Sequence, residues 1–94
     1  MKFKLLAFLL TINFSFSQSA DDCLSNLSIF AEYYKVKNYD SAYEPWMNVR
    51  QECPKMNAAI YSYGKRMLEH YIKTSEGEQK IAYQNDLIKL YDEW

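Results

Sequence analysis

The apolar residues of this chain recur at the spacing of an α-helix, and few residues interrupt that spacing. Offsets of four, three and four separate Ala42, Trp46, Val49 and Cys53, and Pro54 follows directly. These offsets place side chains on one helix face, and a proline ends a helix because it lacks a backbone N–H donor. The 94 residues include only two glycines and two prolines, and they show no alternating strand pattern. The sequence therefore predicts an all-α fold.

Four segments carry the helical period, and we expect each of them to form one helix. They cover residues 22–37, 39–53, 57–74 and 78–94, with short turns between them. Short turns make consecutive helices pack antiparallel, so the expected architecture is two antiparallel helix pairs. Asn38 is expected to take the left-handed conformation that ends the first helix.

Each segment has an apolar face that we expect to lie in the core. In the first segment this face consists of Leu24, Leu27, Ala31 and Tyr34, widened by Phe30 and Tyr33. In the third it consists of Ile60, Tyr63, Gly64, Met67, Leu68 and Tyr71. In the fourth it consists of Tyr83, Leu87, Leu90, Tyr91 and Trp94. A chain of this length buries only a small core, so we expect a covalent staple or a neighbouring unit to support it.

Two residues oppose a regular helix at their positions. Pro45 lies inside the second segment, so the helix either starts near Tyr39 and bends at the proline, or starts at Pro45 itself. We favour the first alternative because the second leaves Ala42 outside the core. Gly64 lies inside the third segment, where it costs ~1 kcal/mol relative to alanine, so we expect another helix to approach closely there. Asn57 is the expected cap of that segment.

Residues 1–17 have the layout of a secretory signal peptide. Two lysines precede an almost wholly apolar run that ends at Phe16, and small residues surround the predicted exit. The run has about half of the ~20 residues that a membrane-spanning helix needs. We predict cleavage after Ser17, with cleavage after Ala20 as the alternative. Residues 18–94 then form one domain of an exported protein, which is periplasmic, on the cell surface or secreted.

The charge pattern excludes two classes of partner. Removing residues 1–17 leaves nine basic and twelve acidic side chains, a formal net charge of −3. The longest basic run is the pair Lys65–Arg66. Nucleic-acid binding requires a concentrated positive surface, and an electrostatic membrane patch requires several adjacent cations. We therefore expect no nucleic-acid partner and no membrane insertion of the exported chain.

The two cysteines are expected to form a disulfide. Cys23 opens the first helical segment and Cys53 closes the second, and these two ends are neighbours in an antiparallel pair. Export brings them to an oxidising compartment, and their number is even. Closing this loop stabilises the fold by ~3–4 kcal/mol in the chain-entropy estimate. The alternative is two reduced cysteines that pack separately.

No group of residues in the sequence suggests catalysis or metal binding. Two cysteines and the distant His70, the only histidine, lack the spacing of zinc ligands. Glu69 precedes His70, and adjacent helical residues do not face each other. No serine or cysteine stands in a known nucleophile motif. We therefore predict no enzyme activity, no cofactor and no metal.

The first and second segments resemble a tetratricopeptide repeat, a helix pair of 34 residues with small and large residues at set positions, which would open at Cys23. With Pro54 at the closing proline, Tyr33 falls on the tyrosine of the first helix. Ala42 and Trp46 fall on the small and the aromatic position of the second helix, and Gly64 on a small position of the next repeat. Two positions depart from the pattern, since Val49 replaces an alanine and Phe30 a small residue, and the next repeat fits only in its first half.

The chain also looks like the N-terminal region of exported tetratricopeptide-repeat proteins of Bacteroidota, which are longer. The features that carry this resemblance are the leader and the motifs Lys37-Asn38-Tyr39-Asp40, Glu44-Pro45-Trp46 and Glu52-Cys53-Pro54. The resemblance implies a scaffold in the bacterial envelope that binds a protein partner and continues beyond this chain. The residues that we expect on the interaction surface are Tyr34, Tyr43, Tyr61, Leu87, Leu90 and Trp94. The alternative is a self-contained secreted protein that binds a small ligand or glycan between its helix pairs, with Trp94 buried.

Overall fold

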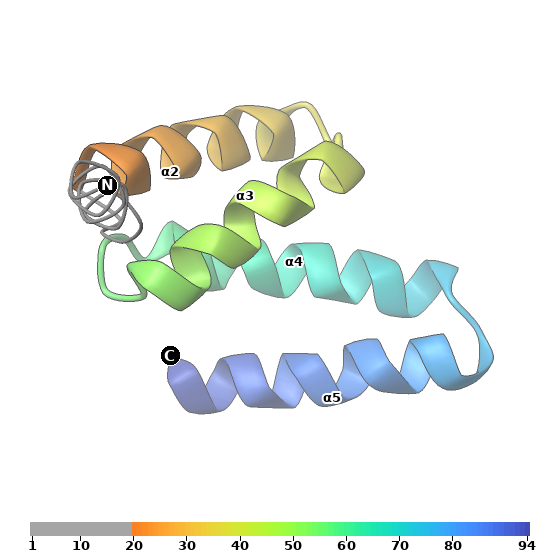
Figure 1. Ribbon diagram of the computed structural model, residues 1–94. Coiled ribbons are helices and arrows are strands. Elements are labelled where there is room, and N and C mark those ends of the chain that lie inside the picture. Colours follow the sequence, from red (N-terminus) through yellow and green to blue (C-terminus); the bar gives the residue numbers. More distant parts are fainter. Residues whose placement is uncertain (1–19) are drawn as a thin grey trace, which may run out of the picture.

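A computed structural model describes residues 20–94, with side chains from Asp22 onward. The described residues form four α-helices and no strand: α2 (Ala20–Lys35), α3 (Tyr39–Glu52), α4 (Ala59–Thr74) and α5 (Gly77–Glu93). Helices α2 and α3 form one antiparallel pair, and α4 and α5 form the other (Figure 1). The predicted all-α fold of two helix pairs is thus confirmed, while the predicted signal peptide lies outside the described residues.

The left-handed residue in the turn between α2 and α3 is not the one that was predicted. Lys37, with φ of 63°, takes that conformation, while Asn38 has φ of −91°. The Lys37 amide donates to the Tyr34 carbonyl at 2.9 Å, which closes α2. Asn38 caps α3 instead, because its side-chain oxygen accepts from the Ser41 amide at 3.3 Å. A turn this short places the asparagine at the start of the next helix, so the prediction for Asn38 was wrong.

Helix α3 begins at Tyr39 and contains Pro45, as predicted. Ala42 is fully buried, which explains why the helix extends to the N-terminal side of the proline. The α3 helix ends where the Cys53 amide donates to the Val49 carbonyl at 2.9 Å. At the start of α4, the Asn57 side chain accepts from the Ala59 amide at 2.8 Å. Asn57 therefore satisfies one of the free N–H groups of α4, although the cap position itself is Ala58, one residue later than predicted.

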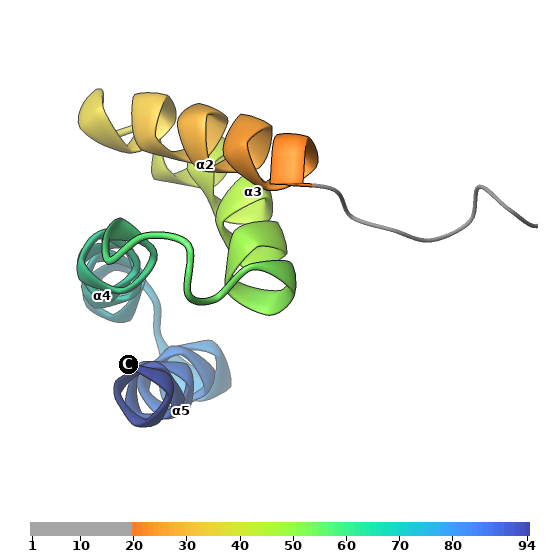
Figure 2. The ribbon, with the colours of Figure 1, turned by 90° about the vertical axis from the view of Figure 1, so that its left-hand side faces the viewer.

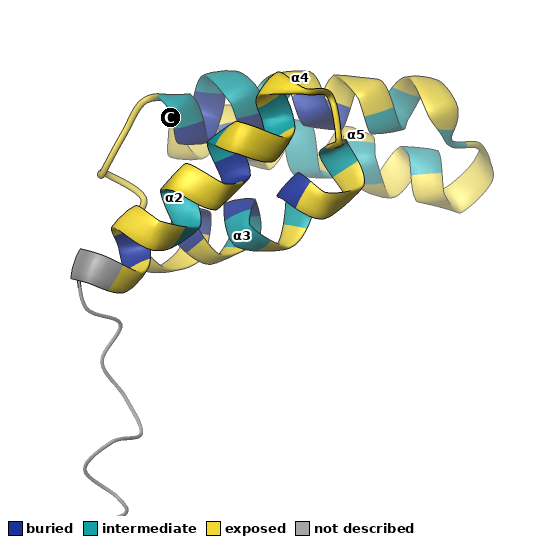
Figure 3. Ribbon diagram, turned by 90° about the horizontal axis from the view of Figure 1, so that it is seen from above, coloured by how far each residue is buried: buried dark blue, intermediate teal, exposed yellow. Residues whose placement is uncertain are grey.

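The core lies where α3 crosses α4. Figure 3 shows that the buried residues of each helix face its neighbours. The fully buried side chains are Phe30, Ala42, Trp46, Val49, Ile60, Met67, Leu68 and Leu90. Trp46 is the largest of them, and its indole Nε1–H donates to the Ile60 carbonyl at 2.7 Å. A methyl group at Gly64 would lie 2.5 Å from the Trp46 ring, which confirms the expected close approach of another helix.

The apolar faces of the outer helices are narrower than predicted. Leu24 is 52% exposed and Tyr33 40% exposed, although both were expected in the core. Tyr91 is 48% exposed on α5. Helices α2 and α5 each pack on one side only, so a smaller arc of each is covered. The prediction of a core position for Tyr33 was therefore wrong, and so were those for Leu24, Tyr91 and Trp94, which is 54% exposed.

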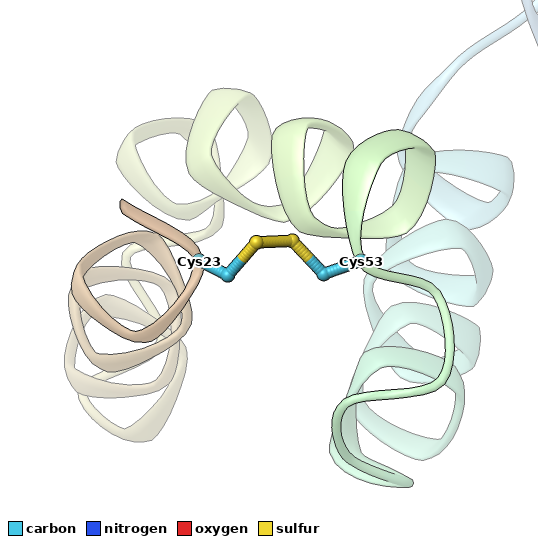
Figure 4. Close-up of a disulfide and its surroundings, with 2 residues drawn as sticks. All are labelled: Cys23 and Cys53. Carbon is cyan, nitrogen blue, oxygen red and sulfur yellow. A yellow bond between two sulfur atoms is a disulfide. The ribbon is translucent and has the colours of Figure 1, made fainter. Parts of the chain in front are cut away.

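The predicted disulfide between Cys23 and Cys53 is present (Figure 4). It joins the first turn of α2 to the residue that follows α3, across a Cα–Cα distance of 6.3 Å. Cys23 is buried, with 6% of its surface exposed. The bond therefore ties together the two open ends of the first helix pair.

The two helix pairs are stacked rather than arranged as a square bundle. Helix α4 packs against both α2 and α3, whereas no Cα atom of α5 lies within 8 Å of one in α2 or α3. Figures 1 and 2 show α2 and α5 at opposite ends of the stack, with α3 and α4 between them. Among the described helices, none combines the length and the apolar character needed to cross a membrane.

Candidate functional site

Three surfaces could carry a function: the outer apolar face of α5, the space between α3 and α5, and a basic hollow beside α4. The predicted interaction residues are divided between surface and core. Trp94 is 54% exposed, and Tyr34, Tyr43 and Leu87 are half-buried. Tyr61 and Leu90 are buried, so the prediction was wrong for these two. The Tyr61 hydroxyl donates to the Pro54 carbonyl at 2.9 Å, and Leu90 belongs to the core.

Helix α5 has a second apolar face, whose two isoleucines sequence reasoning missed. Ile81 and Ile88 lie on the side away from Leu90, Tyr91 follows three positions after Ile88 at the edge of that face, and the three are 55%, 60% and 48% exposed. We call these three residues the outer face of α5. A helix with apolar residues on both sides is normally covered on both sides. Ile81 and Ile88, seven positions apart, could have predicted this face. The prediction used only the stripe through Leu87 and Leu90.

The outer side of α2 carries a similar row. Ile29, Tyr33 and Val36 follow at offsets of four and three, and they are 44%, 40% and 72% exposed. Exposed apolar residues that adjoin one another mark interaction sites more often than isolated ones do. Apolar rows therefore lie on both end helices of the stack.

Arg50 connects α3 to α5 across the gap between their backbones. Its guanidinium makes paired hydrogen bonds with Asp86, at 2.9 and 3.1 Å. It also donates to both oxygens of Glu93, at 2.9 and 3.3 Å. The Trp46 ring lies 5.1 Å from the guanidinium carbon, on its other side. Burial disfavours the charged form of Arg50, but the hydrogen bonds to Asp86 and Glu93 outweigh burial and raise its pKa.

Replacing Arg50 by methionine is expected to lower the free energy of unfolding by about 2 kcal/mol. The arginine side chain is 4% exposed, whereas Asp86 and Glu93 are 25% and 32% exposed. Removing one partner of a buried pair costs ~3–5 kcal/mol, and partial access of water to the two carboxylates reduces that cost. Urea unfolding followed by circular dichroism measures the change. Lys65→Met, which removes a surface pair with Glu69, is the control, and an equal effect of both changes would contradict the structural role of Arg50.

The space between α3 and α5 forms a cleft of about 380 Å³, lined among others by Met47, Arg50, Tyr61 and Lys89. This is the place between the helix pairs where the small-ligand alternative would put its ligand. Asp86 and Glu93 already accept from the Arg50 guanidinium, so these three charged groups of the cleft are engaged with one another. The exposure of Trp94 also differs from what that alternative predicts.

A basic hollow lies between the α2–α3 turn and the second half of α4. Its volume is about 540 Å³, and its lining residues are Tyr34, Lys35, Lys37, Tyr39, Arg66, Glu69, His70 and Lys73. Four cations and one carboxylate therefore share this surface. The expectation that no basic group exceeds the pair Lys65–Arg66 holds along the sequence but is wrong in three dimensions. The fold brings together cations that lie up to 38 positions apart.

Aromatic rings form one wall of the basic hollow. Tyr34 stacks on Tyr63, with ring centroids 4.0 Å apart and planes 8° from parallel. Tyr39 meets the His70 ring edge to face at 4.8 Å. Burial raises the pKa of Tyr34, and the positive charge of Arg66 offsets part of that rise. The phenol of Tyr34 therefore stays protonated beside the cations.

Another tyrosine contact makes stability depend on pH. The Tyr71 hydroxyl donates to Asp40 at 2.5 Å. Burial, this hydrogen bond and the charge of Asp40 raise the pKa of Tyr71 above its ordinary value of 10.0. A phenol whose pKa is higher in the folded state contributes stability that is complete below pH 10.0 and is lost as the pH rises above it.

We therefore expect the free energy of unfolding to fall as the pH is raised above 10, and to fall less steeply in Tyr71→Phe. Urea unfolding at neutral and at alkaline pH measures both slopes. The absorbance of tyrosinate checks the assignment, because the folded variant should lack the tyrosine that titrates last. Identical slopes in the two proteins would show that Tyr71 does not carry the effect.

No protein-family model matches the chain, and neither a curated protein nor a solved structure shows significant similarity to it. The burial of the residues at the expected tetratricopeptide-repeat positions is therefore the remaining evidence on that resemblance. Ala42, Trp46 and Gly64 are buried at the contact between the helix pairs, while Tyr33 and Pro54 are exposed. The three buried residues provide the small–large packing that the fold needs between α3 and α4.

Proposed function

We propose that this chain is an exported helical-repeat module, similar to a pair of tetratricopeptide repeats, that acts as a protein-interaction scaffold in the bacterial envelope. The observation that carries the proposal is the contact of α4 with both helices of the first pair. That contact supports the proposal, because successive units of a helical-repeat protein pack on their neighbours in the same way. Each unit of such a stack covers the apolar face of its neighbour.

The outer face of α5 is the surface that a further unit would cover. Its three apolar residues are exposed on α5, and α5 lies at the end of the stack opposite α2 (Figures 1 and 2). Between the two helix pairs of this chain, the packing of α4 on the first pair provides the corresponding cover. We therefore assign the outer face of α5 to an amphipathic helix of a protein partner. The disulfide fits an exported protein, because such bonds persist in oxidising compartments.

A photo-reactive amino acid at Ile88 tests this proposal in cells that produce the protein. We expect Ile88, which is 60% exposed, to crosslink to a peptide with helical apolar periodicity, identified by mass spectrometry. Glu44, exposed on α3 away from both apolar rows, is the matched control position and should give no such adduct. Equal adducts at both positions, or none at Ile88, would overturn the assignment of the outer face.

A second candidate function is binding of a small ligand or glycan in the cleft between α3 and α5. The cleft volume of about 380 Å³ favours it, because ligand sites commonly measure ~300–1,000 Å³. Three of its charged side chains, Arg50, Asp86 and Glu93, however, already bond to one another. The cleft therefore supports ligand binding less well than the outer face of α5 supports a helical partner.

A further inference from the structure

The basic hollow has a charge opposite to that of the chain as a whole. The complete sequence has a formal net charge of −1, with eleven basic residues. Four of the eleven line the hollow: Lys35, Lys37, Arg66 and Lys73. They come from the end of α2, the following turn and two turns of α4, so the fold rather than a local sequence run gathers them.

These four cations have no carboxylate partner within residues 22–94. The ion pairs of that region join Arg50 to Asp86 and Glu93, and Lys65 to Glu69. Glu69, the one carboxylate that lines the hollow, is therefore already paired with Lys65, which does not line it. Gathered charges of one sign repel one another, and a concave surface strengthens their common field. An anion that enters the hollow would relieve this repulsion.

The aromatic wall fixes the backbone segments from which the cations project. Stacking of Tyr34 on Tyr63 and the contact of Tyr39 with His70 hold the α2–α3 turn against α4. A site whose groups are held in place before the ligand arrives loses less entropy on binding. The tyrosine rings also offer apolar surface next to the charges. The hollow therefore suits a ligand that carries both carboxylates and methylene groups.

We infer that the basic hollow binds an acidic peptide segment of a partner protein. Aspartate or glutamate carboxylates would meet Lys35, Lys37, Arg66 and Lys73, and their methylene groups would lie on Tyr34 and Tyr39. Recognition of acidic motifs by clustered cations is a common mode of peptide binding. A nucleic acid fits less well, because it requires an extended positive surface and the rest of this chain is acidic. The inference deepens the proposed function and rests on it, but it concerns a different surface from the outer face of α5.

The test uses the purified protein with its disulfide intact and a labelled peptide of alternating glutamate and serine. Fluorescence anisotropy should show saturable binding that weakens as salt is added. The same peptide with glutamine in place of glutamate should not bind. In the double variant Arg66→Glu, Lys73→Glu, we expect affinity for the acidic peptide to fall at least about tenfold. Both residues are exposed on α4, and circular dichroism verifies that the variant is folded.

The control double variant is Lys55→Glu, Lys80→Glu, which changes the net charge equally but lies outside the hollow. It should retain the affinity of the unmodified protein within about twofold. Equal losses in both double variants would overturn the inference, because net charge alone would then explain binding. Tighter binding of a single-stranded oligonucleotide, or equal binding of the glutamine peptide, would also overturn it.

Crosslinking at Ile88 separates this inference from the proposed function. If crosslinks at Ile88 persist while the acidic peptide fails to bind, only the inference about the hollow is wrong. If the peptide binds as expected and Ile88 gives no crosslink, the scaffold assignment of α5 fails instead. The Arg66→Glu, Lys73→Glu variant should keep its Ile88 crosslinks, because the two surfaces lie on different helices.

Discussion

Replacing Trp46 by alanine is expected to lower the free energy of unfolding by about 3–5 kcal/mol, as large-to-small changes at buried tryptophans do. Trp46 is fully buried, its indole donates to the Ile60 carbonyl, and its ring fills the space that Gly64 leaves open. The substitution opens a cavity at the contact between the helix pairs and removes a donor from a buried carbonyl. Because domains of this size have a total stability of ~5–15 kcal/mol at most, we expect a marginally folded variant.

Thermal and urea unfolding, followed by circular dichroism, measure this change. Trp94→Ala is the matched control, since Trp94 is 54% exposed and stacks on one side of the core, against the buried Tyr61 and the exposed Tyr91. Its effect should stay below about 1 kcal/mol. Trp46→Phe, which keeps most of the ring volume and loses the N–H donor, should show an intermediate effect if the alanine variant does not fold. A larger cost at Trp94 than at Trp46 would contradict the position of the core.

Removing the disulfide by Cys23→Ser, Cys53→Ser is expected to lower the free energy of unfolding by about 3–4 kcal/mol. The two residues are 30 positions apart, and a bond across that interval restricts the unfolded chain far more than the folded one. Unfolding of the unmodified protein with and without a reductant measures the same quantity independently. The double serine variant should be insensitive to reductant. If reductant destabilised both proteins equally, the effect would not come from this bond.

Much of the fold could be predicted because it depends on local spacing. The offsets among Ala42, Trp46 and Val49 define the buried face of α3, and the buried alanine decides how far the helix extends beyond Pro45. The disulfide could also be predicted, because antiparallel packing brings the start of one helix to the end of the next. Exposure was harder to predict, since the width of a buried face depends on the number of neighbours. Leu24 and Tyr33 illustrate this on α2, which packs on one side only.

The candidate surfaces could be predicted only in part, because their members are distant in sequence. Arg50 bonds to Asp86 and Glu93, which lie 36 and 43 positions away in the sequence, and no local sequence pattern predicts that contact. The basic hollow combines Lys35 and Lys37 with Arg66 and Lys73, which lie about 30 positions further along the sequence. Two isoleucines of the outer face of α5 were visible in the sequence, but the apolar stripe through Leu87 and Leu90 was the stronger pattern. The charged and apolar surfaces of this protein can therefore be recognised only once the relative positions of the helices are known.

The disulfide also determines how the molecule responds to mechanical tension. A chain pulled at both ends normally releases every residue that unfolds, at ~3.3–3.6 Å each. The bond between Cys23 and Cys53 removes the intervening 30 positions from that extension, which shortens it by about 100 Å. The second helix pair has no such bond and is held by packing and by the Arg50 contacts. Tension along the chain would therefore lengthen the C-terminal pair and leave the first pair as an inextensible link.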